Sequence, residues 1–293
     1  MRLLNAVLGF SFFAAGTMHA AGLTPGPILS AAPSQYVTSD GTRIHYKVIG
    51  RGRPTIVFLH GLGGDLNLWR EQVAALHTKA RLILIDLPGH GGSEAPASYS
   101  MRRFARAVSA VLKQTNTERA ILVGHSIGAL IALEVDRNYP AHCRAVVSVD
   151  GMLRNPFPEP EAAAKVLASF QGPDGDAHLG GFYDGMLSAA PPSLRDEIRT
   201  AALAMPRAAL VGTFQATLLP EAWKDNDKLS VPLYAVMANS PYTKDHYLQY
   251  VRGLGNDVTI DVIDGTDHYL MLDAAENFNA RLEKWLEAHK WMK

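Results

Sequence analysis

The feature that most restricts the fold of this chain is a serine on a tight turn between an apolar run and a helical pattern. Residues 124–128 read Gly-His-Ser-Ile-Gly and directly follow the apolar run Ala-Ile-Leu-Val at 120–123. Residues 127–139 have the pattern of a helix. Glycines two positions to either side of Ser126 keep Cβ atoms out of the crowded turn, so the serine hydroxyl can project above a sheet. The pattern therefore predicts a strand, a presented serine and a helix, in that order.

Short apolar strands alternate with amphipathic helices through the first half of the chain. Asp-Gly at 40–41 predicts a hairpin across residues 36–49. Further strands are expected at 55–59, 81–85, 120–123 and 144–149, and helices at 66–78, 101–115 and 127–139. This alternation is typical of a mostly parallel central sheet with helices on both faces.

Residues 153–225 interrupt the alternation. They contain many Ala, Pro, Met and Gly residues and no convincing strand. Helices are expected there at 161–170, 193–205 and 207–219, and the alternation then resumes with a strand at 229–238, a helix at 244–253, a strand at 257–263 and a helix at 274–291. We therefore predict one α/β core, formed by residues 36–152 and 226–293, with a helical insertion between its two parts.

Several predicted strands are followed by loops rich in glycine or histidine. These loops are His-Gly-Leu-Gly-Gly at 60–64, Asp-Leu-Pro-Gly-His-Gly-Gly-Ser at 86–93 and Asp-His-Tyr-Leu at 267–270. Together with Gly-His-Ser-Ile-Gly, they occur in the order typical of the α/β-hydrolase superfamily, which residues 36–290 resemble. The resemblance implies the α/β-hydrolase fold, with the insertion at 153–225 as a helical cap over the active site.

The resemblance also implies roles for individual residues. Ser126 is the predicted nucleophile, and a serine hydroxyl is nearly unreactive until a base takes its proton. His268 is the implied base, because it lies in the loop between the last predicted strand and the last predicted helix. The backbone amides of Leu62 and Ile127 are the implied oxyanion hole, which stabilises the negative oxygen formed when the serine attacks a carbonyl.

The carboxylate that orients the base departs from the family pattern. Most relatives carry it just after the strand that follows the cap, but here that strand ends Met-Ala-Asn-Ser-Pro at 237–241. An alternative family arrangement places it at the end of the preceding strand, where Asp150 stands. Catalytic groups gather at this edge of open α/β sheets. We therefore predict Asp150, with Asp245 as the alternative and Asp264 and Asp267 as further candidates.

The predicted activity is hydrolysis of a carboxylic ester of a small or apolar substrate through an acyl-enzyme. Apolar residues of the insertion and its border either line a substrate pocket or form the cap's own core, and both interpretations stay open. These residues are Met152, Phe157, Phe182, Tyr183, Met186 and Trp223. Lactonase, amidase or carbon–carbon bond hydrolase activity with the same triad is the alternative, because the fold does not choose among them. A non-catalytic ligand-binding receptor on the same scaffold is a further alternative.

Composition and the N-terminal segment provide the remaining expectations. The 293 residues include 28 basic and 28 acidic side chains, and no basic run predicts a nucleic-acid groove. Residues 1–22 combine Arg2, an apolar stretch and small residues at 20–22, which predicts a signal peptide and a periplasmic or secreted protein. We expect no stable membrane span after its removal, and residues 23–35, with three prolines, as a flexible lead-in. A small-molecule substrate is expected, without a metal or cofactor; the oligomeric state stays open.

Overall fold

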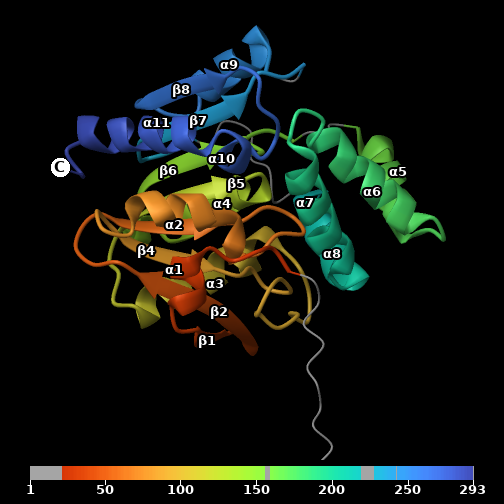
Figure 1. Ribbon diagram of the computed structural model, residues 1–293, viewed down its shortest axis with the longest axis horizontal. Coiled ribbons are helices and arrows are strands. Elements are labelled where there is room, and N and C mark those ends of the chain that lie inside the picture. Colours follow the sequence, from red (N-terminus) through yellow and green to blue (C-terminus); the bar gives the residue numbers. More distant parts are fainter. Residues whose placement is uncertain (1–21, 156–158, 219–227, 242, 293) are drawn as a thin grey trace, which may run out of the picture.

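An eight-stranded sheet forms the centre of the computed structural model, which describes residues 22–155, 159–218, 228–241 and 243–292 (Figure 1). The strand order is β1-β2-β4-β3-β5-β6-β7-β8. The strands are β1 (Gln35–Ser39), β2 (Thr42–Ile49), β3 (Thr55–Leu59), β4 (Arg81–Ile85), β5 (Ala120–His125), β6 (Cys143–Val149), β7 (Leu233–Ala238) and β8 (Val258–Ile263). The predicted hairpin β1–β2 is antiparallel, β2 pairs antiparallel with β4, and the other pairs are parallel. The α/β-hydrolase fold is therefore confirmed.

Helices cover the sheet on both faces. The helix α2 (Arg70–Leu76) packs against α11 (Ala275–Ala288), and α3 (Met101–Gln114) packs against α4 (Ile127–Asn138) (Figure 1). Every residue of β5 and β7 is buried. Burial from both sides explains why these strands appear in the sequence as continuous apolar runs rather than alternating patterns.

Three boundaries differ from the sequence-based expectation. The predicted helix at 66–78 is a 3₁₀ turn, η1 (Leu66–Trp69), followed by α2. The helix predicted at 274–291 is α11, which ends at Ala288, and a separate short helix, α10 (Leu270–Asp273), precedes it. The strand expected from residue 229 begins at Leu233. Pro232, directly before it, has no N–H to donate to a sheet.

The insertion between β6 and β7 consists of four helices in the described residues. These are α5 (Pro160–Gln171), α6 (Gly175–Met186), α7 (Pro192–Ala204) and α8 (Arg207–Leu218), which stand together at one end of the molecule (Figure 1). The sequence analysis did not anticipate α6, which contains four glycines. Glycine weakens a helix by about 1 kcal/mol relative to alanine, so packing within the cap overrides its low propensity.

The segment at 23–35, expected as a flexible lead-in, is instead packed on the core. Leu23 and Leu29 are buried, and residues 27–31 form the short helix α1 (Pro27–Ala31). The Lys47 ammonium donates to the Leu29 carbonyl at 2.6 Å. The prolines do not prevent this packing, because the first turn of a helix needs no N–H from Pro27. Residues 1–21 of the predicted signal peptide lie outside the described residues.

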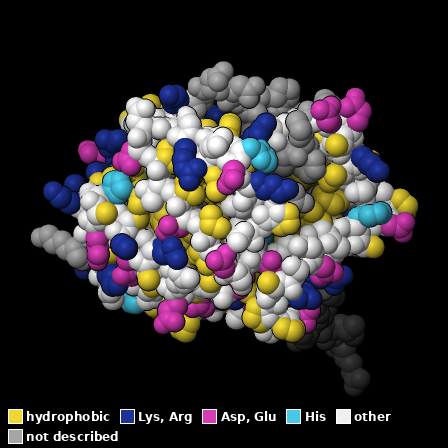
Figure 2. All heavy atoms as spheres, turned by 90° about the horizontal axis from the view of Figure 1, so that it is seen from above, with side chains coloured by type: hydrophobic (Ala, Val, Ile, Leu, Met, Phe, Trp, Pro, Cys, Tyr) yellow, Lys and Arg dark blue, Asp and Glu magenta, His cyan; other side chains and the backbone are white. Residues whose placement is uncertain are grey.

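The surface carries both charge signs. Figure 2 shows acidic and basic side chains interspersed over one face of the molecule. Tyr36 on β1 is 44% exposed, and the Arg43 guanidinium lies 4.7 Å from its ring centroid. In the part of the chain that the structure describes, no helix has the length and apolar character needed to cross a membrane.

Candidate active site

Ser126 lies on the turn between β5 and α4, in a strained backbone conformation. Its φ is 54° and its ψ is −119°, a region whose occupation costs on the order of 1–3 kcal/mol. The turn requires glycine at both flanking positions. A Cβ on Gly124 would collide with the backbone of Gly128, and a Cβ on Gly128 would collide with the backbone of Leu59. The Ser126 amide donates to the Val149 carbonyl of the neighbouring strand at 3.1 Å. The serine is therefore presented at the carboxyl edge of the sheet, where the sequence analysis placed it.

Asp150 and His268 are hydrogen-bonded to each other. His268 Nδ1 donates to Asp150 Oδ2 at 2.6 Å, and the two side chains are 17% and 22% exposed. The other oxygen, Asp150 Oδ1, accepts the amide of Ala238 at 3.0 Å. Because a carboxylate only accepts, Nδ1 of His268 carries a proton, and in the neutral ring Nε2 keeps a free lone pair.

The position of Asp150 explains the departure from the family pattern. It follows the last residue of β6, with φ at 41°, a left-handed conformation that aspartate tolerates better than most residues. Its amide donates to Val236 of β7 at 2.8 Å. The strand β7 thus contributes the Ala238 N–H that holds a carboxylate from β6, where most relatives are expected to contribute the carboxylate itself.

His125 links the serine turn to the loop of His268. Its Nε2 lies 2.9 Å from the His268 carbonyl, and the two rings are 4.6 Å apart between centroids. Since a carbonyl only accepts, Nε2 carries the proton of this ring. Burial, followed by the nearby His268, lowers the pKa of His125 well below 6.5. His125 is therefore a neutral contact between the two loops that carry Ser126 and His268.

The predicted oxyanion loop runs beside the serine. A Cβ on Gly61 would lie 3.2 Å from Ser126 Cβ, which shows how closely this backbone approaches the nucleophile turn. Leu62 is 7% exposed, and Ile127, 2% exposed, begins α4 directly after the serine. The N-terminal amides of a helix point toward negative charge. The two predicted oxyanion donors therefore belong to backbone segments that adjoin Ser126, the loop after β3 and the first turn of α4.

Asp86 organises the loops beneath this site. Its carboxylate accepts the His45 ring and the amides of Leu66 and Gly92, each at 2.7 Å. Burial alone would raise the pKa of Asp86, but the bond from His45 and the nearby His60 lower it overall. Asp86 is thus a structural anchor for the loops after β3 and β4. Among the described residues, no group of three or more His, Cys, Asp or Glu side chains is arranged to hold a metal ion.

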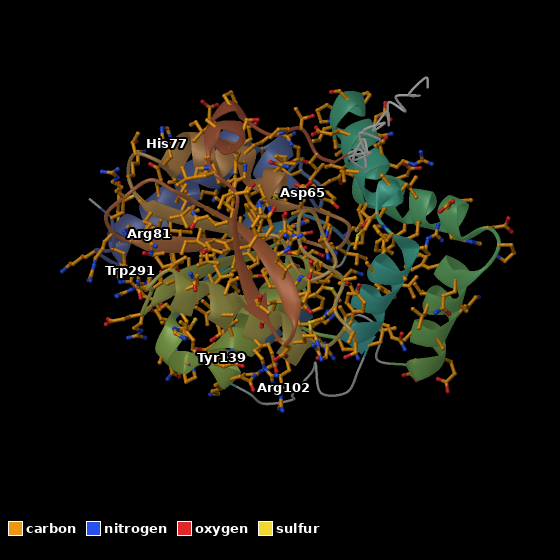
Figure 3. The ribbon with its side chains drawn as sticks, turned by 90° about the horizontal axis from the view of Figure 1, so that it is seen from below. Asp65, His77, Arg81, Arg102, Tyr139 and Trp291 are labelled. Atoms are coloured by element: carbon orange, nitrogen blue, oxygen red, sulfur yellow. The ribbon has the colours of Figure 1, made fainter. Side chains whose placement is uncertain are left out.

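Asp65 belongs to the same buried region. Burial, together with the charge of Asp86, raises the pKa of Asp65 to about 7. Figure 3 shows Asp65 on the side of the core that faces the cap, while Arg81, the first residue of β4, lies toward the other side. The loops at the carboxyl ends of the strands, and not those at the amino ends, therefore face the cap.

The other carboxylates considered for the triad lie elsewhere. Asp245 is exposed at the first residue of α9 (Asp245–Arg252). Asp264 accepts from the Asn239 side chain at 2.6 Å. Asp267 accepts from the Ala190 amide at 3.2 Å and from the Ala189 amide, both in the cap. Of the carboxylates in the described residues, Asp150 is the one bonded to His268.

The candidate pocket residues are placed in different environments. Phe182 packs in the cap, 5.5 Å from Phe170 and 6.4 Å from Phe214 between ring centroids, as the cap-core interpretation expects. Tyr183 is fully buried. Met186 is half-buried, and Met152, also half-buried, donates its amide to the Ser126 carbonyl at 3.2 Å. Phe157 and Trp223 lie outside the described residues.

Asp267 was considered only as a triad member, and its contact with the cap was missed. Besides the two alanine amides, it accepts from Ser188 Oγ at 3.4 Å. Arg195 of α7 also bonds to this part of the cap, with Nε donating to the Leu187 carbonyl at 3.1 Å. The position of Asp267 directly before His268 shows that one loop carries both the base and the anchor of the cap.

Comparison with known proteins agrees with this architecture. Residues 54–173 match the family model described as the alpha/beta hydrolase fold. Among solved structures, a thermophilic esterase from Thermogutta terrifontis superposes with a TM-score of 0.78 and 19% identity, over 88% of this chain and 99% of the other. At that identity the likeness shows the fold. The family match and the structural likeness therefore agree on the α/β-hydrolase fold for this chain.

Two curated relatives match part of the chain. The 2-hydroxy-6-oxononadienedioate/2-hydroxy-6-oxononatrienedioate hydrolase of Paraburkholderia phymatum is 35% identical over 150 residues, 47% of this chain and 52% of the relative. The putative carbamate hydrolase RutD of Pantoea ananatis is 34% identical over 113 residues, 37% of this chain and 41% of the relative. The chain thus spans about half or less of the length of these relatives.

Proposed function

We propose that this protein is a serine hydrolase that cleaves a carboxylic ester of a small or apolar substrate through an acyl-enzyme. The observation that carries the proposal is the 2.6 Å bond between His268 Nδ1 and Asp150 Oδ2, beside the strained turn of Ser126. Such a pair fixes the tautomer of a base and stabilises its protonated form. A purely structural role for the turn gives no reason for the backbone strain at Ser126.

In the proposed reaction, His268 Nε2 takes the proton of Ser126 Oγ while the oxygen attacks the ester carbonyl. The amides of Leu62 and Ile127 stabilise the oxyanion, and each such donor is worth about 3 kcal/mol of barrier. His268 then protonates the departing alkoxide, which leaves as the alcohol. A water molecule, deprotonated by His268, attacks the acyl-enzyme and releases the carboxylic acid and free Ser126. Asp150 stays ionised and stabilises the imidazolium in both half-reactions.

The names of the relatives provide the alternatives. One is named a hydrolase of an oxo-dienedioate and another a putative carbamate hydrolase, so carbon–carbon or carbamate cleavage by the same residues is the competing proposal. A screen of p-nitrophenyl esters of increasing acyl length, lactones, aryl amides, carbamates and a vinylogous 1,5-diketone separates these. We expect the highest kcat/KM on an ester. A higher value on the diketone or carbamate would replace ester cleavage as the proposed reaction.

A fluorophosphonate probe tests the nucleophile directly. The probe phosphonylates a serine only when a base activates it, and we expect one adduct, on the peptide that contains Ser126. Ser126→Ala should abolish the labelling. Ser169→Ala, which removes a cap hydroxyl that donates to the Val166 carbonyl, should leave it unchanged. A folded wild-type protein that takes up no probe would favour the ligand-binding receptor on the same scaffold.

We also propose export of the protein, because residues 1–22 combine a basic residue, an apolar stretch and small residues. Intact-mass measurement of protein recovered from the periplasm or medium of a bacterial host should give a chain shortened by about 20 residues. A chain of full mass, or protein confined to the cytosol, would contradict export.

A further inference from the structure

Tyr183 connects the cap to the loop that carries a predicted oxyanion donor. It lies on α6 and is fully buried, and its hydroxyl donates to the Leu62 carbonyl at 2.9 Å. Its ring meets that of Phe182 edge-on, at 5.6 Å between centroids, so the cap's aromatic cluster holds it in place. Burial raises the pKa of Tyr183 well above 10. The hydroxyl therefore stays protonated and remains a donor.

The preceding peptide of the loop is held from the core. The Gly61 carbonyl accepts His60 Nδ1 at 2.8 Å and the Gly64 amide at 3.2 Å. His60 Nε2 accepts the Leu87 amide at 3.0 Å, so the proton of the neutral ring must be on Nδ1. Because a peptide group is planar and trans, a fixed Gly61 carbonyl fixes the opposite direction for the Leu62 N–H.

Two successive peptide planes around Leu62 are thus bonded, one to the core and one to the cap. The first contains the Leu62 N–H, and the second contains the Leu62 carbonyl that accepts from Tyr183. Fixing both planes fixes the backbone dihedrals of Leu62 between them. Removing the Tyr183 hydroxyl leaves the second plane with one restraint fewer and gives Leu62 room to rotate.

The neighbouring glycine leaves room for this contact. Gly63 has φ at 69°, and a Cβ there would collide with the Tyr183 hydroxyl. The second glycine of the His-Gly-Leu-Gly-Gly loop therefore permits both the left-handed turn and the approach of the tyrosine. The motif is shaped to receive a side chain from a separate part of the chain, 121 residues away from Leu62.

We propose that Tyr183 is a positioning residue, which holds the Leu62 amide in the orientation needed to bind the oxyanion without itself touching the substrate. The inference rests on the proposed function, since it assigns a role within the same reaction. It gives Tyr183 a role beside the two interpretations that the sequence left open, pocket lining and cap core. A side chain that contacts substrate changes the affinity for substrate, whereas a residue that orients an oxyanion donor changes the stability of the transition state.

The test compares two buried tyrosines. Tyr183→Phe removes the hydroxyl and keeps the ring, and we expect kcat on an ester to fall about 10- to 100-fold, because small misplacements of catalytic groups have effects of this size. KM should change less than about twofold, as uniform binding is untouched. Tyr234→Phe is the matched control: its hydroxyl is bonded to Asp261 at 2.6 Å between β7 and β8. It should leave kcat and KM near wild type.

Binding of a trifluoromethyl ketone provides a second readout. Such a ketone forms a tetrahedral adduct with an activated serine and places its oxyanion in the hole. Tyr183→Phe should weaken this inhibitor by the same factor by which it lowers kcat, and should leave inhibition by the carboxylic acid product unchanged. Equal weakening of ketone and product would show that Tyr183 contacts substrate and would overturn the proposal.

Two further replacements separate a lost donor from a lost fold. If Tyr183→Phe yields little folded protein, 4-fluorophenylalanine at position 183 fills the space of the hydroxyl without donating. 4-Aminophenylalanine keeps a donor there and should restore kcat to within about threefold of wild type if one hydrogen bond carries the effect. A folded non-donor variant with kcat within twofold of wild type would overturn the proposal.

Fluorophosphonate labelling of the wild-type protein tests the serine mechanism independently of the Tyr183 variants. Wild-type protein that is not labelled by fluorophosphonate at Ser126 contradicts the serine mechanism and removes the basis of this inference. Labelling at Ser126 together with full kcat in the donor-free variants leaves the serine mechanism standing and rejects the role of Tyr183 alone.

Discussion

The turn that carries Ser126 and the cap helix α7 differ in how deeply they are buried. All residues of β5 and the first ten residues of α4 are buried, whereas α7 in the cap has two buried residues among 13. Close packing on all sides holds the turn. The cap packs apolar side chains against the core and is also attached to it by a few directed bonds. Single substitutions should therefore affect chemistry in the core and, in the cap, the placement of loops.

Among the directed bonds that join described residues of the cap and the core, three attachments reach separate parts of the core. Tyr183 bonds to the loop after β3, and the cap turn at 188–190 bonds to Asp267 in the loop after β8. Glu197 of α7 forms a two-pronged ion pair with Arg70 of α2, at 3.2 and 3.0 Å. Two of these three attachment points lie on loops that carry predicted catalytic groups. The cap is thus tied to the catalytic loops and is more than a cover over a pocket.

The largest effect is expected from Ser126→Ala, which tests the role of the closely packed turn between β5 and α4. Loss of the nucleophile should lower kcat by on the order of 10⁶-fold, as in related triads. The packed turn should keep the variant folded, with a thermal midpoint close to wild type. Purified Ser126→Ala that retains more than about a tenth of the turnover would refute the nucleophile assignment.

Asp150→Asn should have the next largest effect. The amide can donate to Nδ1 and so favours the wrong tautomer of His268, a change that lowers turnover about 10⁴-fold in a serine protease. Asp245→Asn, at the exposed start of α9, is the matched control and should stay near wild type. Steady-state kinetics on one ester decide the matter. An inactive Asp245 variant beside an active Asp150 variant would reverse the assignment.

Most of the core was predictable because its signals are local. The strand before Ser126, the glycines around it and the loop position of His268 can all be read from neighbouring residues. Asp150 was predicted as the carboxylate partner of His268 because the strand β7 ends without a carboxylate at the usual family position. The Ala238 amide that holds Asp150 was not predictable, because every residue but proline has an N–H and the sequence gives no mark of which one is used.

The contacts between cap and core were not predictable, because their partners are distant in the sequence. In the sequence, Tyr183 is one of several aromatic residues of the insertion. No neighbouring residue in the sequence indicates that its hydroxyl bonds to the loop at Leu62. Asp267 was weighed only against its neighbour His268. The prolines around Leu23 and Leu29 suggested a flexible segment, so the packing of these two leucines was not predicted. Tertiary partners decided each of these positions, and local patterns carry no information on them.

Asp267→Asn should have a smaller effect and tests the attachment of the cap. Hydrogen bonds to a charged acceptor are worth about 1.5–3 kcal/mol, and the amide keeps one acceptor, so we expect a loss of about 2 kcal/mol in stability. KM should rise a few-fold with a smaller change in kcat, and limited proteolysis should cut the cap faster. Asp196→Asn, on an exposed position of α7, is the control. Equal proteolysis of both variants would remove Asp267 from the role of cap anchor.

The smallest expected effect concerns pH and the buried histidines of the core. Burial, followed by the nearby His60, lowers the pKa of His90 to about 3. The unfolded chain binds a proton at this residue below about pH 6.5, whereas the folded protein does not, so stability is present above pH 6.5 and is lost as the pH falls toward 3. The contribution of His90 to this loss should be about 1 kcal/mol between pH 8 and pH 6.

Urea unfolding of His90→Asn at these two pH values measures that contribution. The difference in the free energy of unfolding between pH 8 and pH 6 should be smaller than in wild type by about 1 kcal/mol. His246→Asn, which removes an exposed histidine of α9, is the control. An unchanged pH dependence in the His90 variant would contradict a neutral buried imidazole at this position.

The bond from the Ala238 amide to Asp150 relaxes the requirement for particular side chains at the end of β7. With the carboxylate moved to β6, the end of β7 is required to supply a main-chain donor and space, and no particular functional side chain. Substitutions in the loop that follows can therefore accumulate without loss of the Asp–His pair. Proline at 238 is the replacement that removes the donor altogether. The loop from Asn239 onward is thus a place where the chain can change, by insertion or by new side chains, while the Asp150–His268 pair stays in place.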